Sequence, residues 1–99
     1  MEPVMTVYLI AFVKPKDPTL MREYSAAAGP TIGPAGGKIV GRGKVKELAG
    51  TLAADAALIV SFENLAALEA WYGGSAYQAL IPLRDKAMDA TFVSIDVPA

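Results

Sequence analysis

The stretch LIVSFENLAALEAWYGGSAYQALIPLR, residues 58–84, decides the fold of this chain. Residues 57–62, at its beginning, form a short apolar run with many branched side chains, which is typical of a strand buried on both faces. Asn64 follows at the position of a helix N-cap, ahead of alanines and leucines that favour helix. The stretch therefore predicts a buried strand followed directly by a helix.

Two glycines and a proline divide the second part of this stretch. Gly73-Gly74 predicts the end of the helix, because glycine adopts left-handed backbone at little cost. Ser75 and Gln78 have the spacing of a capping box, which predicts that a second helical segment starts at once. Pro82 cannot lie deep in an unbroken helix, so we expect a kink or a restart just before it.

The region before residue 36 predicts a strand and a helix. Residues 4–13 are apolar at both even and odd positions, as in a strand that is covered on both faces. Asp17-Pro18 has the pattern of an N-cap followed by proline at the first helical position. We expect Gly29-Pro30 to interrupt this helix and residues 32–35 to add one more turn.

Residues 38–46 alternate like an edge strand, whose lysines guard against stray pairing. The alternation predicts Ile39 and Val45 on one side, and Arg42 with the lysines on the other. A connection of uncertain form follows, with Leu48 and Leu52 as its expected anchors to the core.

Residues 91–97 predict the last strand, with Val93, Ile95 and Val97 on one apolar face. The order is then strand, helix, strand, strand, helix, strand. Right-handed crossovers and an antiparallel return in the middle make this a ferredoxin-like βαββαβ sandwich, an α+β fold with both helices on one face of an antiparallel four-stranded sheet. The chain, residues 1–99, is expected to form one domain.

The open face of this sheet predicts a homodimer. Hydrophobic residues make up 54% of the chain and charged residues 19%, which is a high apolar content for so small a protein. The first strand carries Tyr8, Ile10 and Phe12 on one side and other apolar residues on the opposite side. Because such a face is poorly suited to water, we expect a second copy to cover it, sheet face to sheet face.

Composition disfavours several classes of function. The net charge of -1 provides no positive electrostatic field that would attract nucleic acid or an anionic membrane. The chain has no cysteine and no histidine, so disulfides, thiolate sites and the commonest general base and metal ligand are excluded, and we expect no metal and no cofactor. Residues 4–13 are too short to span a bilayer and lack a basic segment before them, which favours a cytoplasmic protein.

Six residues are candidates for binding a small molecule between the sheet and the helices. An arginine holds a carboxylate or phosphate with its planar fork, aromatic rings cover an apolar body, and a phenol donates a hydrogen bond. The alternatives are solvated arginines and aromatic rings that only pack in the core. The candidates are Tyr24, Arg42, Trp71, Tyr72, Tyr77 and Arg84.

An ordered set of residues spans nearly the whole chain. It consists of Tyr24, Pro30, Gly36-Gly37 and Arg42-Gly43 in the first half, and of Phe62, Ala70-Trp71-Tyr72, Ser75, Tyr77-Gln78 and Leu83-Arg84 in the second. This set resembles the pattern of the DUF1330 proteins, a family within the dimeric α/β-barrel superfamily. The resemblance implies the barrel fold and the dimer, but no established reaction.

The chain departs from that pattern at two places. It has Ala49-Gly50 where the family commonly has Glu-Gly, and Ser61-Phe62-Glu63 where the family often has Glu-Phe-Pro.

We expect the chain to form a small homodimer whose function is to bind a small, anionic and partly apolar molecule. The alternatives are a structural dimer without catalysis, and an enzyme similar to the cofactor-independent monooxygenases or isomerases of the superfamily.

Overall fold

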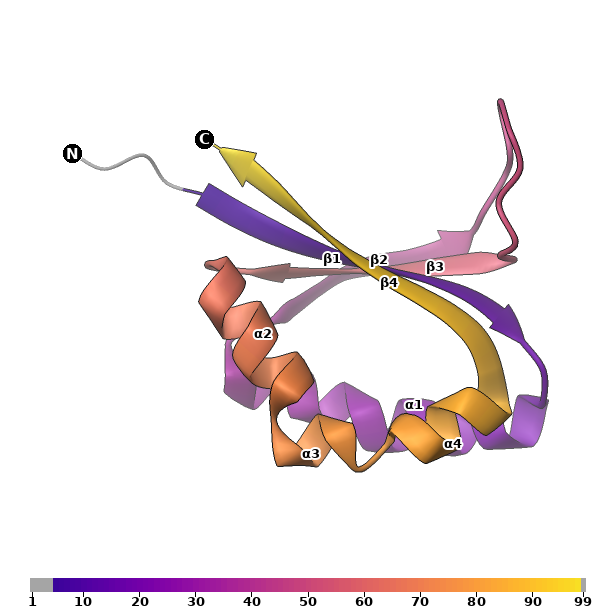
Figure 1. Ribbon diagram of the computed structural model, residues 1–99, viewed down its shortest axis with the longest axis horizontal. Helices are drawn as coiled ribbons and strands as arrows, with labels where there is room; N and C mark the ends of the chain where they lie inside the picture. Colours follow the sequence, from indigo (N-terminus) through magenta and orange to yellow (C-terminus); the bar gives the residue numbers. More distant parts are fainter. Residues whose placement is uncertain (1–4, 99) are drawn as a thin grey trace.

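The computed structural model describes residues 5–98. Four strands form one antiparallel sheet in the order β2-β3-β1-β4, and the helices lie together on one face of it (Figure 1). The strands are β1 (Met5–Pro15), β2 (Lys38–Lys44), β3 (Ala56–Phe62) and β4 (Met88–Pro98). The helices are α1 (Pro18–Ile32), η1 (Gly33–Ala35), α2 (Leu65–Gly73), α3 (Ser75–Gln78) and α4 (Ile81–Ala87). This confirms the predicted ferredoxin-like fold.

The two faces of the sheet differ in what covers them. Val7 and Leu9 of β1 pair with Phe62 and Val60 of β3, and all four side chains are buried under the helices. The alternate position Ile10 pairs with Ile59 and Val93 and therefore points to the opposite, open face. None of the described helices covers that face (Figure 1).

Helix α1 begins as predicted and continues further than predicted. The Asp17 carboxylate accepts hydrogen bonds from the backbone N–H groups of Thr19 and Leu20 at 2.9 and 3.1 Å, which makes it the N-cap. The expected interruption at Gly29-Pro30 is wrong, because the helix runs through it to Ile32. Ile32 is buried in the core, and this tertiary packing holds the last turn despite the hydrogen bond that proline lacks. The predicted extra turn is present as η1.

Strand β2 contains a β-bulge that changes the predicted sides of its residues. Ile39 pairs with Val60, whereas Arg42 pairs with Leu58, and the register shifts between Ile39 and Gly41. The extra residue reverses the alternation, so that Ile39 and Arg42 share the side that faces the helices. The prediction that they lie on opposite sides is therefore wrong.

The segment after β3 has the predicted elements but different contacts at one junction. The Asn64 side chain accepts from the backbone N–H of Ala67 at 2.8 Å and caps α2, as predicted. Gly74 is extended, with φ -70° and ψ 153°, so the prediction of left-handed backbone there is wrong. A Cβ at this position would lie 2.9 Å from the Ala70 carbonyl oxygen, which shows that close backbone approach requires the glycine.

The predicted capping box is also absent. No side chain among the described residues caps α3, and the Gln78 Nε2 group donates instead to the Tyr72 carbonyl oxygen at 2.6 Å. That bond ties α3 back to the end of α2. The restart next to Pro82 is confirmed, because α4 begins at Ile81.

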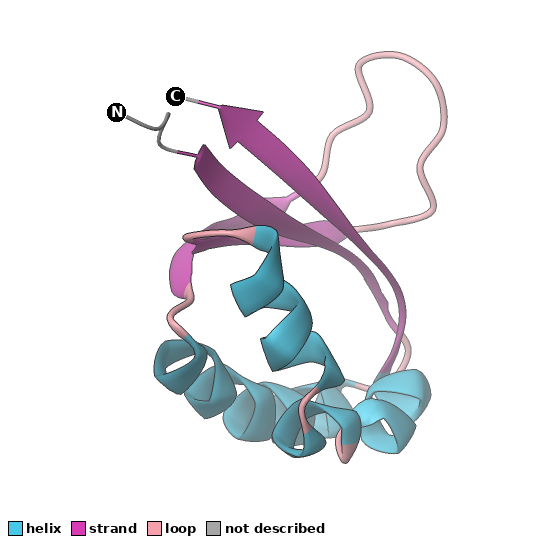
Figure 2. Ribbon diagram, turned by 60° about the vertical axis from the view of Figure 1, so that its left-hand side comes forward, coloured by secondary structure: helices cyan, strands magenta, loops and turns pink. Residues whose placement is uncertain are grey.

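The connection between β2 and β3 extends away from the helices (Figure 2). Leu48 on it is 90% exposed and Leu52 is also exposed, so the prediction that they anchor the connection is wrong. The connection is tied at its base, where the Val45 N–H donates to the Asp55 carbonyl oxygen at 3.0 Å. Beyond this point neither leucine reaches the core.

Candidate functional site

Aromatic rings from three elements, α2, α3 and β4, meet on the helix-facing side of the sheet. Tyr77 is completely buried, and its ring centroid lies 4.5 Å from that of Trp71 and 5.2 Å from that of Tyr72. Phe92 of β4 lies 6.0 Å from Tyr72 and 6.2 Å from Tyr77, centroid to centroid. The rings therefore form one continuous wall between α2, α3 and the sheet.

Trp71 belongs to the buried part of this wall. Only 6% of it is exposed, and its indole N–H donates to the Thr31 hydroxyl at 2.9 Å. The bond joins α2 to the end of α1 and satisfies the one polar atom of the indole. Trp71 thus packs in the core, which is the alternative role considered for it.

Arg84 of α4 lies against the same wall. Its Nη1 donates to the hydroxyl oxygens of Tyr72 at 3.0 Å and Tyr77 at 3.4 Å, and its guanidinium carbon lies 5.3 Å from the centre of the Phe92 ring. The side chain is only 15% exposed. Its carboxylate partner, Asp85, is 3.3 Å away but is itself 65% exposed, so this ion pair is weak.

The environment keeps Arg84 positively charged. Burial alone would lower the pKa of its guanidinium, but the hydrogen bonds to Tyr72 and Tyr77 favour the charged form and raise the pKa above its usual range. Nη2 takes part in no hydrogen bond among residues 5–98. Arg84 is therefore a fixed, half-buried cation with donor capacity left over.

A chain of hydrogen bonds leads from Arg84 to α1. The hydroxyl groups of Tyr77 and Tyr24 are 2.6 Å apart, and burial raises the pKa of both phenols, so both are protonated. The Tyr77 oxygen accepts from Arg84, and either hydroxyl group can be the donor of the bond between Tyr77 and Tyr24. When Tyr77 donates, the hydrogen of Tyr24 is free for another acceptor.

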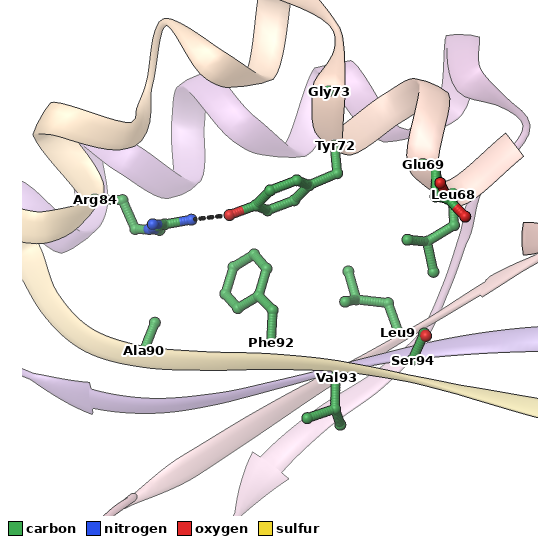
Figure 3. Close-up of a pocket in the computed structure, with 10 residues that line it drawn as sticks. All are labelled: Leu9, Leu68, Glu69, Tyr72, Gly73, Arg84, Ala90, Phe92, Val93 and Ser94. Atoms are coloured by element: carbon green, nitrogen blue, oxygen red, sulfur yellow. Dashed lines mark hydrogen bonds between the residues drawn. The ribbon is translucent and has the colours of Figure 1, made fainter. Parts of the chain in front are cut away.

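Arg84 and Tyr72 line an open groove of about 490 Å³ between α2, α4 and β4 (Figure 3). Phe92 and Leu9 form its floor, and Leu68 lies on the α2 side. Glu69 lies at the opposite end from Arg84 (Figure 3). The groove is thus apolar in the middle, with a cation at one end and a carboxylate at the other.

Arg42 lies elsewhere, beside a second hollow between α1 and the sheet. Two adjoining cavities of about 160 and 70 Å³ are both lined by Arg42, Tyr24 and Phe92. Arg42 is exposed, and it makes no hydrogen bond or ion pair with the side chains that the structure describes. The fold therefore separates the two candidate arginines, with the Tyr24–Tyr77 pair and Phe92 between them.

Sequence reasoning missed Phe92, which lines both spaces, as well as Leu9, Ser94 and Glu69 in the groove. Phe92 had a detectable signal. It is the one aromatic residue in residues 91–97 and alternates with Val93 and Ile95, so it belongs to the other face of that strand.

Residues 5–98 contain no group of histidine, cysteine or acidic side chains placed to hold a metal ion, and no helix among them has the length and apolarity to cross a bilayer.

Proteins of known structure with a similar fold include the following three. A protein of unknown function from Rhodopseudomonas palustris has 19% identity and a TM-score of 0.74, with 91% of this chain and 80% of that chain covered. A dimeric ferredoxin-like protein of unknown function from Thermobifida fusca has 17% identity and a TM-score of 0.63, covering 97% and 92%. SnoaB, a cofactor-independent oxygenase from Streptomyces nogalater, has 10% identity and a TM-score of 0.62, covering 95% and 92%. These likenesses show the fold.

The sequence itself matches no curated protein. It does match a family model, that of the domain of unknown function DUF1330, over residues 6–97. The matched region includes every residue of the groove and of the Arg84–Tyr77–Tyr24 chain. This chain therefore belongs to the DUF1330 family.

Proposed function

We propose that the groove between α2, α4 and β4 binds a small monoanion with an apolar body, and that Arg84 holds the anionic group. The observation that carries this proposal is the half-buried guanidinium, which is fixed by two tyrosine hydroxyls and has one ion-pair partner among the described residues, an exposed carboxylate. A cation that is already desolvated and oriented binds a carboxylate or phosphate with little further ordering.

The rest of the groove supports an apolar or aromatic body. Tyr72, Phe92, Leu9 and Leu68 supply its apolar surface, and about 490 Å³ is within the range of about 300–1,000 Å³ common for small-molecule sites. Glu69 at the far end repels a second negative charge. The preferred ligand thus carries one negative charge, next to Arg84.

The same geometry favours binding over proton-transfer chemistry. A reaction like that of a cofactor-independent oxygenase or isomerase needs a group that takes a proton from the substrate. Burial raises the pKa of Tyr24 and Tyr77, so neither phenol is a good base near neutral pH. The likeness to SnoaB is one of fold at 10% identity and supplies no base. We therefore rank a binding protein above an enzyme.

A titration with 1-naphthoate, a flat aromatic monoanion, tests the groove. We expect binding to the wild-type protein, followed by isothermal calorimetry, and a loss of affinity of about 10- to 100-fold in Arg84→Gln, because a charged hydrogen bond contributes about 1.5–3 kcal/mol. Arg22→Gln, at an exposed position of α1, is the matched control and keeps wild-type affinity. Equal affinity in Arg84→Gln and wild type would remove Arg84 from the site.

We also propose that the protein works as a homodimer in which a second copy covers the open face of the sheet. Apolar side chains cover this face on both central strands and on the edge strand β4, and the related Thermobifida fusca protein is dimeric. Covering them removes apolar surface from water at about 25 cal/mol per Å². The residues of this face include Tyr8, Ile10, Phe12, Ile59, Val93, Ile95 and Val97.

Analytical ultracentrifugation separates this dimer from a monomer. Ile95→Asp places a charge on the open face and is expected to give a monomer at micromolar concentration, whereas the wild type sediments as a dimer. Leu65→Asp changes a similarly exposed leucine on the helical side and leaves the dimer intact. A wild-type monomer contradicts the proposal. A dimer that binds no small anion would favour a purely structural role.

A further inference from the structure

We propose a second binding site, for a small monocarboxylate, in the hollow between α1 and the sheet. The two cavities there, of about 160 and 70 Å³, adjoin each other and share lining residues from five elements. This hollow lies on the other side of Phe92 from the groove, so it is a separate site with its own arginine. The shared lining residues are Ala11, Tyr24, Ser25, Arg42, Leu58 and Phe92.

The size of the larger cavity limits the ligand. A buried apolar cavity of about 150 Å³ accepts one benzene molecule. The cavity of about 160 Å³ is of this size, and Val13, Leu58, Met21 and Met88 give it apolar walls. Its occupant is thus a compact apolar body of about the size of a benzene ring, smaller than the ligand that the groove accepts.

The charge around this hollow selects an anion. Arg42 lines both cavities and has no ion-pair partner among the described residues, and none of the lining residues is acidic. The bulge in β2 is what brings Arg42 to this side.

Tyr24 adds a neutral hydrogen-bond donor to the lining of the same hollow. Its hydroxyl group lies 2.6 Å from that of Tyr77, and when Tyr77 is the donor of this bond, the Tyr24 hydrogen has no other acceptor among the described residues. A carboxylate presents two oxygens, one for the guanidinium of Arg42 and one for the hydroxyl of Tyr24. The hollow therefore has an apolar space for the body of the ligand and two hydrogen-bond donors suited to one carboxylate.

Benzoate is the probe, and the methyl groups of Met21 and Met88 are the reporters, because both residues line the larger cavity. In a titration followed by NMR of 13C-methyl methionine, we expect saturable shifts of both methyl signals in the wild-type protein. Arg42→Gln weakens this binding about tenfold, as expected for loss of one charged hydrogen bond. Lys44→Gln, on the same strand and side, is the matched control and keeps the wild-type affinity.

A second pair of variants tests the hollow itself. Ser25 is an exposed lining residue of α1, so Ser25→Leu fills the entrance without disturbing the core and abolishes the methyl shifts. Ala26→Leu, its exposed neighbour outside the lining, leaves them unchanged. Benzyl alcohol, the neutral analogue, is expected to bind about tenfold more weakly than benzoate, since it lacks the charge that Arg42 recognises.

The second site would be overturned by methyl signals that do not move with benzoate, by equal weakening in Arg42→Gln and Lys44→Gln, or by unchanged binding in Ser25→Leu. Benzoate binding that is lost in Arg84→Gln but kept in Arg42→Gln places the probe in the groove. That outcome refutes the second site and leaves the proposed function standing.

Discussion

Arg84 and Arg42 carry the same charge but lie in opposite environments. Arg84 is half-buried on α4, donates to two tyrosine hydroxyls and lies over the Phe92 ring. Arg42 is exposed on β2, and no described side chain bonds to it. Sequence alone treats the two as equivalent candidates. The contacts of an arginine, more than its presence, thus decide how well it is prepared to bind an anion.

The tyrosines are the main cause of this difference. Tyr77 is fully buried and touches Trp71, Tyr72, Tyr24 and Phe92 with its ring or its hydroxyl. It therefore supports the wall on which Arg84 rests and, through its hydroxyl, connects that wall to α1. None of the side chains in residues 5–98 supports Arg42 with a hydrogen bond or an ion pair.

The largest effect is expected when this support is removed. Tyr77→Ala leaves a cavity at the centre of the aromatic wall and should lower the free energy of unfolding by about 3–5 kcal/mol, the usual range for a buried aromatic residue. Urea denaturation measures this loss. Tyr77→Phe keeps the ring and loses only its hydrogen bonds, so it should be clearly less damaging. Equal losses in the two variants would mean that packing of the ring contributes little.

A smaller effect distinguishes the two arginines directly. Arg84→Gln removes the donor that Tyr72 and Tyr77 share, so we expect a loss of about 1–3 kcal/mol in the free energy of unfolding. Arg42→Gln changes an exposed side chain and should stay within about 0.5 kcal/mol of the wild type. Thermal and urea denaturation of the two variants side by side provide the check. Matching losses would show that the two environments do not differ in the way described.

The smallest effect concerns alkaline pH. Burial raises the pKa of Tyr24 above the ordinary tyrosine value of about 10. Above about pH 10 the unfolded chain releases this proton while the folded chain keeps it, so the contribution to stability is complete below pH 10 and is lost as the pH rises further. One such group changes the free energy of unfolding by at most about 1.4 kcal/mol per pH unit.

Tyr24→Phe removes that group and should therefore flatten the decline in stability between about pH 10 and 11, measured by urea denaturation at each pH. Tyr8→Phe changes a tyrosine on the open face, outside the hydrogen-bond chain, and serves as the control. A decline that is identical in Tyr24→Phe and wild type would contradict the description of Tyr24 as a buried, proton-retaining phenol.

Local features of the fold were predictable from the sequence. Asp17 and Asn64 cap their helices and α4 restarts beside Pro82, because these effects depend on a few neighbouring residues. The predicted order of strands and helices then indicated the four-stranded antiparallel sheet. The bulge after Ile39 was not predicted, although Gly41 inside the strand was a possible signal for it, and the one inserted residue reverses the alternation. The exposure of Leu48 likewise depends on how far its connection extends from the core.

The candidate site was predictable in its residue types but not in its grouping. The hydroxyl groups of Tyr24 and Tyr77 meet across 53 residues of sequence, and Arg84 joins them only because α4 folds back against α1. Contacts of this kind depend on tertiary packing, which no local pattern encodes. Spacing alone therefore identified both arginines as candidates without separating them.

We propose Arg84 as the anion-binding group of the groove. A titration with 1-naphthoate, followed by 15N NMR of the Nε–Hε signals of the arginine side chains, tests this role. We predict that the Arg84 signal moves with saturation and that those of Arg22 and Arg42 move far less. Saturable shifts at Arg22 or Arg42 with a stationary Arg84 signal would contradict it.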